Sequence, residues 1–378
     1  MEKKRILHIS KYYYPFRGGT EQTARDCVNA LAQDFEQKVI CFNSEKNVRN
    51  DIVDNVDIIR CGCFTKISSQ SLSLSYAKRL SNVFKTFMPD VVIFHYPNPF
   101  VAALLLRYIP ESCRLIVYWH LDIVKQKILG KIFFGQNKRI LSRANIIIST
   151  SPNYIKGSPW LSSVEAKCKV IPSCINESRL QIYDSVIKES MAIKQLYSGK
   201  ILCLAIGRHT EYKGFNYLIQ ASKLLDDRFE IFITGDGELT AELKKEATGD
   251  KKIHFLGVIS DEQLKAYLLS MDIYCFSSVT KNEAFGLALA EGMYFGKPAV
   301  TFTIPGSGVN YVSLNNVTGI EVENRNVIEY AKAIEILGSN ESLRKKYGEA
   351  AKERVKTHFL YSQYKLSIQK IVKEITDI

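Results

Sequence analysis

Short apolar segments alternate with longer amphipathic segments along this chain, first over residues 5–172 and again over residues 200–302. Short apolar runs are typical of buried strands, and the longer segments have the periodicity of helices. Because strands that alternate with helices form parallel sheets covered on both faces, the pattern predicts an α/β fold. Its repetition predicts two Rossmann-like parallel-sheet domains that face each other across a central cleft.

The chain has 378 residues, which is more than one ordinary hydrophobic core requires. We expect an N-terminal domain over 1–175, a polar linker over 176–198 and a C-terminal domain over 199–358. A last helix at about 360–378 is expected to pack back on the N-terminal domain. The main expected strands are 5–10, 38–42, 56–61, 90–95, 114–119 and 145–150, then 200–206, 229–234, 253–256, 273–276 and 298–302.

Both halves open with a strand, a glycine-bearing loop and a helix. Gly18 and Gly19 lie in the first loop, and Gly207 and Gly214 in the second. Such loops place helix N-terminal N–H groups at the carboxyl edge of the sheet, where they hold phosphate groups.

Few features suggest a metal, a cofactor or a membrane span. The nine cysteines are scattered through apolar runs, which is typical of buried thiols in a reducing compartment. Cys61-Gly62-Cys63 lacks a second cluster, and no Asp-x-Asp motif or ligand-spaced cluster occurs. The N-terminus does not resemble a signal peptide, and no segment of ~20 apolar residues occurs. We therefore expect a cytoplasmic protein without metal or cofactor.

Two cations, Arg208 and Lys213, follow the first strand of the second half, just before a helix. A diphosphate has oxygens for both, and arginine binds such groups in bidentate fashion. Two solvated charges in a surface loop are an equally open interpretation.

Two carboxylates, Glu283 and Glu291, flank the start of a later helix. Glu283 lies in the loop after the strand at 273–276, and Glu291 lies two turns into the helix. Acceptors placed in this way suit hydroxyl groups on two parts of one ligand, such as a sugar and a ribose. A capping acid and a solvated helix acid are the alternative.

Together these motifs resemble the family-4 retaining glycosyltransferases, which have the GT-B fold. The resemblance covers nearly the whole chain. The matching strings are Gly207-Arg208, Lys213-Gly214, Gly235-Asp236-Gly237, Phe255-Leu256-Gly257 and Glu283 through Glu291, with Tyr13-Tyr14-Pro15 and Gly18-Gly19-Thr20-Glu21 in the first half.

The resemblance implies a nucleotide-sugar substrate and a role for each matching residue. Arg208 and Lys213 would hold the donor diphosphate, Glu283 would contact donor-sugar hydroxyls, and Glu291 would bind the ribose. The backbone at Val258 would meet the base. The full donor-binding set would be Gly18, Gly19, Gly207, Asp236, Val258, Phe285, Gly286, Leu287 and Glu291.

His120 directly follows the strand at 114–119 and resembles the histidine that family members place beside the donor sugar. The resemblance therefore adds His120 to Glu283, Arg208 and Lys213 as a catalytic candidate. A structural histidine is the alternative. Asp122 is expected to orient either His120 or its loop.

Segments 95–100, 119–127, 304–310 and 317–319 are similar to the subgroup that builds bacterial O-antigens and exopolysaccharides. This similarity implies mannose transfer from GDP-mannose to a lipid-linked glycan. A UDP-sugar donor, carrying glucose, galactose or an N-acetylhexosamine, is the alternative.

The excess of basic over acidic residues lies entirely in the first half. Residues 1–180 hold 26 lysines and arginines against 14 acids, whereas the remainder holds 25 of each. Basic and apolar residues mixed at helical spacing favour attachment to an anionic membrane, here the inner face of the plasma membrane. An ordinary helix with a solvated basic face is the alternative. The patch comprises Lys78, Arg79, Lys125, Lys127, Lys131, Lys138 and Arg139.

Two other classes of protein remain open. A nucleotide-sugar epimerase has the same fold, but we find no matching pattern of catalytic acids. A nucleic-acid-binding protein would use the basic half. The basic residues lie among aliphatic rather than stacking aromatic residues, so no nucleic-acid partner is expected.

Overall fold

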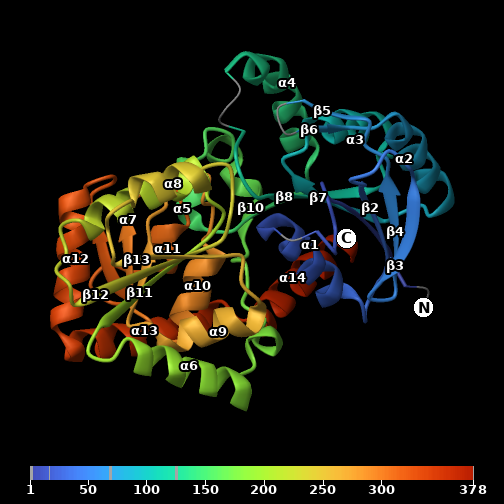
Figure 1. Ribbon diagram of the computed structural model, residues 1–378. Helices are drawn as coiled ribbons and strands as arrows, with labels where there is room; N and C mark the ends of the chain where they lie inside the picture. The colour runs from blue at the N-terminus through green and yellow to red at the C-terminus, as the bar shows by residue number, and fades with distance from the viewer. Residues whose placement is uncertain (1–2, 17, 68–69, 124–126, 378) are drawn as a thin grey trace. The chain divides into compact units, whose positions relative to one another are not determined.

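The computed structural model describes residues 3–16, 18–67, 70–123 and 127–377 (Figure 1). The chain divides into two compact units. Unit 1 comprises Met1–Ser173 and Tyr361–Ile378, and unit 2 comprises Cys174–Leu360. Within the described residues, no helix has both the length and the apolar sequence that crossing a membrane requires.

Unit 1 is built on an eight-stranded sheet in the order β10-β9-β8-β7-β1-β2-β4-β3. All neighbouring strands are parallel except β3 and β4. The central strand β7 is buried throughout, as its apolar sequence predicts. The strands are β1 (Arg5–Ile9), β2 (Glu36–Phe42), β3 (Arg49–Val53), β4 (Val56–Cys61), β7 (Val91–Tyr96), β8 (Arg114–Trp119), β9 (Ile146–Ser149) and β10 (Cys168–Val170).

Helices cover this sheet. Helix α1 packs against the C-terminal helix α14, and α3 packs against both α2 and α4 (Figure 1). Asp34, just after α1, accepts from Gln369 at 3.1 Å and pairs with Lys373 at 3.1 Å, both on α14. The helices are α1 (Gly19–Leu31), α2 (Leu74–Thr86), α3 (Pro99–Tyr108), α4 (Lys127–Arg143), α5 (Pro152–Gly157) and α14 (Tyr361–Thr376), with a hairpin of β5 (Thr65–Ile67) and β6 (Gln70–Leu72).

Unit 2 is built on a six-stranded, wholly parallel sheet in the order β13-β12-β11-β14-β15-β16. Its strands are β11 (Ile201–Ile206), β12 (Phe229–Thr234), β13 (Ile253–Gly257), β14 (Ile273–Phe276), β15 (Ala299–Phe302) and β16 (Gly319–Val322). Its helices are α6 (Asp184–Leu196), α7 (Phe215–Ser222), α8 (Thr240–Glu246), α9 (Asp261–Ser270), α10 (Leu287–Tyr294), α11 (Val309–Val312), α12 (Val327–Ser339) and α13 (Glu341–His358).

The strand order of each sheet reverses at one place. In unit 2 the chain runs from β11 outward to β13 and then returns to β14 on the other side of β11. In unit 1 the same reversal separates β1 from β7. Open α/β sheets bind their ligands at such switch points, beyond the carboxyl ends of the strands.

The expected linker over 176–198 is wrong as a free connection. It contains α6, which packs against α9 inside unit 2. The Ser270 hydroxyl donates to the Ser190 carbonyl at 3.1 Å, and Lys265 donates to the Gln181 carbonyl at 2.8 Å. These contacts make the segment part of the unit.

Candidate functional site

The loop after β11 and the loop after β14 are pressed together at the switch point of unit 2. Gly214 has a φ of 61°, and a Cβ on it would lie 2.3 Å from the Ser277 carbonyl oxygen. Only glycine fits there. The Ser277 hydroxyl donates to the Lys213 carbonyl at 2.9 Å. The loops that carry the predicted cations and Glu283 are therefore held in contact.

Lys213 and Glu283, both predicted from the sequence, form an ion pair at this contact. The Ser278 hydroxyl also donates to the Glu283 carboxylate, at 3.1 Å. Burial lowers the pKa of Lys213, but the adjacent Glu283 carboxylate outweighs it and the pKa is raised. Lys213 is therefore a cation at neutral pH.

The segment between Glu283 and α10 is fixed through its backbone. The Ser307 hydroxyl donates to the Glu283 carbonyl, and Gly308 N–H donates to the Ala284 carbonyl at 3.1 Å. Phe285 is buried, with its ring edge-to-face on Phe359 at 5.4 Å.

Helix α10 begins directly after Gly286, whose φ is 95°. The first N–H groups of a helix, here those of Leu287 and its successors, have no carbonyl partner within that helix. They are therefore donors without a carbonyl partner in α10, and their predicted contact with a donor-substrate oxygen stays a prediction.

Glu291 lies in the second turn of α10 and is half-buried. Burial raises the pKa of its carboxyl group to about 7; Arg179 opposes the shift and Asp261 adds to it. Near neutral pH the group is both a donor and an acceptor, which suits the hydroxyls of a ribose.

The remaining predicted residues of unit 2 lie in loops at strand ends. Arg208 is exposed, and within the described part of the chain its side chain has no hydrogen-bond partner. Gly207 directly follows β11 and lies beside the Lys213 side chain. Val258 follows β13 and is 81% exposed.

Asp236 accepts hydrogen bonds from the Gly237 N–H at 2.8 Å and from the Thr240 hydroxyl at 2.6 Å. These contacts stabilise the loop to which Asp236 itself belongs.

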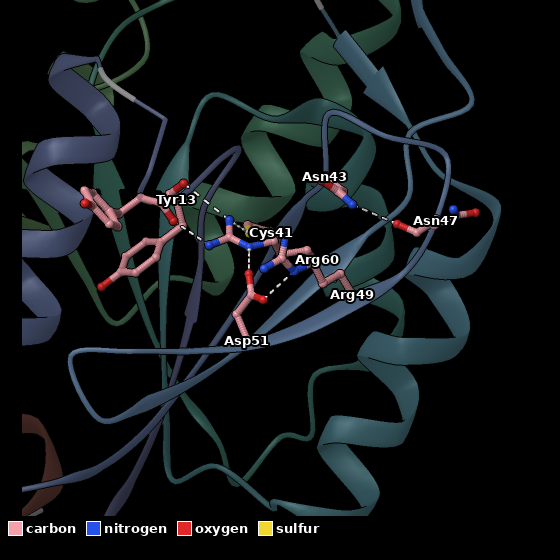
Figure 2. A network of polar contacts seen from close by, with 8 residues as sticks. Tyr13, Cys41, Asn43, Asn47, Arg49, Asp51 and Arg60 are labelled. Carbon is pink, nitrogen blue, oxygen red and sulfur yellow. Dashed lines mark hydrogen bonds and ion pairs between the residues drawn. The ribbon is translucent and has the colours of Figure 1, made fainter.

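In unit 1, Gly18 and Gly19 are exposed at the start of α1. The loop before them is held by Arg60 of β4, which is 3% exposed (Figure 2). Arg60 donates to Asp51 at 2.5 Å, to the Tyr13 carbonyl at 3.3 Å and to the Tyr14 carbonyl. Sequence reasoning missed Arg60, although a charge inside an apolar strand was a signal.

His120 is buried at the end of β8, and its Nε2 lies 3.0 Å from Nδ1 of His95. Burial lowers the pKa of His120 to about 3, so the ring is neutral. Asp122 accepts from Trp119 Nε1 at 2.9 Å and from Ser158 at 2.8 Å. Asp122 was predicted to orient either His120 or its loop, and these contacts support the loop. The His120 ring is instead held by His95.

The basic patch is only partly described. Lys78 and Arg79 on α2 and Lys138 and Arg139 on α4 are exposed. The opposite side of α4 is buried in the unit through Asn137, Ile140 and Leu141. Lys125 lies outside the described residues, as do the side chains of Lys127 and Lys131.

Two doubly wound units with a cation–carboxylate pair at a switch point are typical of α/β enzymes that bind an anionic ligand beyond the strand ends. Residues 17–179 match the family model described as Glycosyltransferase Family 4, and residues 186–354 match Glycosyl transferases group 1. The chain therefore belongs to the family-4, group 1 glycosyltransferases. This membership favours a glycosyltransferase over the epimerase and nucleic-acid-binding alternatives.

Individual relatives agree with this assignment. The chain is 29% identical over 359 residues to O-antigen chain mannosyltransferase C of Escherichia coli, covering 94% of each. It is 27% identical to D-rhamnosyltransferase WbpZ of Pseudomonas aeruginosa, covering 94% of this chain and 92% of that one. Sucrose-phosphate synthase from Thermosynechococcus elongatus has the same GT-B fold, with a TM-score of 0.81, 17% identity and 99% of both chains covered.

Proposed function

We propose that the protein is a retaining glycosyltransferase that moves mannose from GDP-mannose to a lipid-linked glycan acceptor in the synthesis of a bacterial surface polysaccharide of the O-antigen type. Two relatives that match nearly the whole chain are named for transfer of mannose and of D-rhamnose. D-Rhamnose is 6-deoxymannose, so the two sugars share the configuration of their ring hydroxyls. This shared chemistry favours mannose over glucose or galactose.

The observation that carries the proposal is the Lys213–Glu283 pair at the switch point of unit 2. A cation and an acceptor in contact suit a ligand that has a diphosphate next to a hydroxylated sugar. Arg208, exposed in the same loop, adds a second cation for the diphosphate. Glu283 accepts from sugar hydroxyls, and Glu291 binds the ribose.

The proposed reaction is a front-face displacement without metal. The bond between the sugar anomeric carbon and the diphosphate oxygen breaks as the acceptor oxygen bonds to the same face of that carbon. The acceptor proton passes to the departing phosphate oxygen. Arg208, Lys213 and the N-terminus of α10 stabilise the charge that develops on the leaving group. The roles of Gly18, Gly19 and His120 stay predictions.

We further propose that unit 1 attaches to the anionic inner face of the plasma membrane. Lys78 and Arg79 on α2 share that helix with Leu74, which is 84% exposed. On α4, Lys138 lies 5.1 Å over the ring of Phe134, which is 50% exposed. Exposed cations beside exposed apolar groups are typical of surfaces that bind anionic lipids.

The test is a thermal-shift screen against GDP, UDP and their sugars, followed by transfer to a lipid-linked acceptor. A ligand at 100 times its Kd stabilises by ~2.7 kcal/mol, so the preferred nucleotide will stand out. We expect GDP and GDP-mannose to stabilise most, and the product to keep the donor's anomeric configuration by NMR. Stabilisation by UDP sugars alone would overturn the donor. Failure to transfer sugar from any donor would overturn the enzyme proposal.

A further inference from the structure

Three metal-binding side chains meet inside unit 1. His8 belongs to β1, His95 to the neighbouring strand β7, and Cys27 to α1. His8 Nδ1 or Nε2, Cys27 Sγ and a His95 ring nitrogen lie within 4.8 Å of one another, and the three residues are at most 1% exposed. Sequence reasoning missed the cluster because strand pairing and helix packing, not sequence spacing, bring the residues together. We propose that these residues bind one Zn²⁺ ion.

The tautomer of His8 follows from its hydrogen bonds. His8 Nε2 lies 2.7 Å from Gln37 Oε1, while Gln37 Nε2 donates to the Val28 carbonyl at 2.9 Å. Because the amide nitrogen must face Val28, Oε1 accepts from His8, and the proton is on Nε2. His8 Nδ1 therefore has a lone pair, and it is buried without a hydrogen-bond partner among the described residues. A buried lone pair held by a fixed ring is what a metal ligand requires.

His95 repeats this arrangement on the next strand. Its Nδ1 lies 3.0 Å from His120 Nε2, and its Nε2 is buried without a partner in the described part of the chain. When Nδ1 donates to His120, Nε2 presents a second lone pair.

Cys27 supplies the third ligand, and its side chain is fully buried. In the absence of metal Cys27 is a free thiol that carries its proton. Binding forms the zinc–sulfur bond and releases that proton to solvent. Ligands with bonds of about 2.0–2.3 Å to one zinc lie roughly 3.3–3.8 Å apart, so small inward shifts suffice.

Two nitrogens and one thiolate form a ligand set that suits Zn²⁺. Mg²⁺ and Ca²⁺ prefer oxygen ligands instead. An ion here would tie α1 to the two central strands at the switch point of unit 1. It would also fix His95, and with it the hydrogen bond to His120. The proposal does not depend on which sugar the enzyme transfers.

The test uses full-length protein without a histidine tag, first stripped with a chelator. We expect it to take up about one equivalent of Zn²⁺ by elemental analysis, to melt at a higher temperature with Zn²⁺ than with Mg²⁺, and with Co²⁺ to develop a thiolate-to-cobalt charge-transfer band. Cys27→Ser should abolish the band. Cys113→Ser removes another buried thiol of unit 1 and should keep it.

Two results would overturn the proposal. One is wild-type protein that binds neither ion after stripping and refilling, with circular dichroism showing that it remains folded. The other is a cobalt–thiolate band that persists in folded Cys27→Ser protein. If Cys27→Ser does not fold, His8→Gln, which keeps a polar side chain of similar length, replaces it and should weaken uptake at least tenfold. Unchanged uptake in folded His8→Gln protein would equally contradict the site.

Discussion

Lys213 and Glu283 lie 70 residues apart in the chain, yet the Lys213 ammonium donates directly to the Glu283 carboxylate. Each therefore neutralises the other before any donor arrives. A bound diphosphate would share the lysine, which frees carboxylate oxygen to accept from a sugar hydroxyl. The pair thus links recognition of the diphosphate to recognition of the sugar.

Removal of either cation should slow transfer strongly. We expect Arg208→Ala and Lys213→Met each to lower kcat/KM by roughly 10²-fold or more, because each removes a preorganised charge from the leaving group. Steady-state transfer from GDP-mannose measures this. Lys332→Met removes an exposed cation on α12 and should leave the rate unchanged. Full activity in folded Arg208→Ala protein would exclude the proposed diphosphate site.

The raised pKa of Glu291 predicts a pH-dependent stability. The folded protein keeps the Glu291 proton up to about pH 7, whereas an unfolded chain loses it near the ordinary value of 4.5. The stability that the protonated carboxyl contributes is present below pH 4.5 and is lost as pH rises through 7. The free energy of unfolding of Glu291→Gln, measured relative to that of the wild type, should therefore rise by about 1–3 kcal/mol between pH 4.5 and pH 8. Urea unfolding at a series of pH values measures the difference, and parallel profiles would contradict the assignment.

Arg60 should be important for the stability of unit 1. Arg60→Met leaves the Tyr13 and Tyr14 carbonyl groups without this donor in the interior, and we expect a loss of about 3 kcal/mol. Arg49 provides a matched control, because it donates to the same Asp51 at 2.6 Å but is largely exposed. Arg49→Ala should cost under about 1 kcal/mol. Chemical denaturation followed by fluorescence compares the two variants, and equal losses would refute the expectation.

The basic surface of unit 1 should control membrane binding. Lys138→Glu and Arg139→Glu should each weaken binding to vesicles of anionic lipid by roughly fivefold, since a cation near such a surface contributes about 1 kcal/mol. Sedimentation with vesicles at two salt concentrations measures the effect. Lys223→Glu, on an exposed position of unit 2, should bind like wild type. Vesicle binding that changes neither in the two glutamate variants nor with salt concentration would contradict the membrane proposal.

The alternation of apolar and amphipathic segments predicted both parallel sheets, because a buried strand has a recognisable sequence. It did not predict β3, whose sequence Arg49–Val53 is polar and largely exposed at a sheet edge. It also gave no indication that α6 packs on α9, since helix packing depends on tertiary contacts.

The sequence was enough to predict those parts of the candidate site that lie within a single loop. The loops bearing Lys213 and Glu283 could be assigned to one sheet edge, but their ion pair depends on strand order. The His95–His120 contact depends on register: His95 of β7 is paired with Tyr118 of β8, which places His120 just beyond. Such relationships between strands are absent from a linear sequence.

Helix α14 has a consequence for how the chain is made. It packs on α1, so unit 1 contains a helix that lies after the whole of unit 2 in the sequence. A ribosome delivers the residues of unit 2 before it delivers α14. The α1 surface that α14 covers therefore stays exposed until all of unit 2 has been synthesised and α14 has emerged.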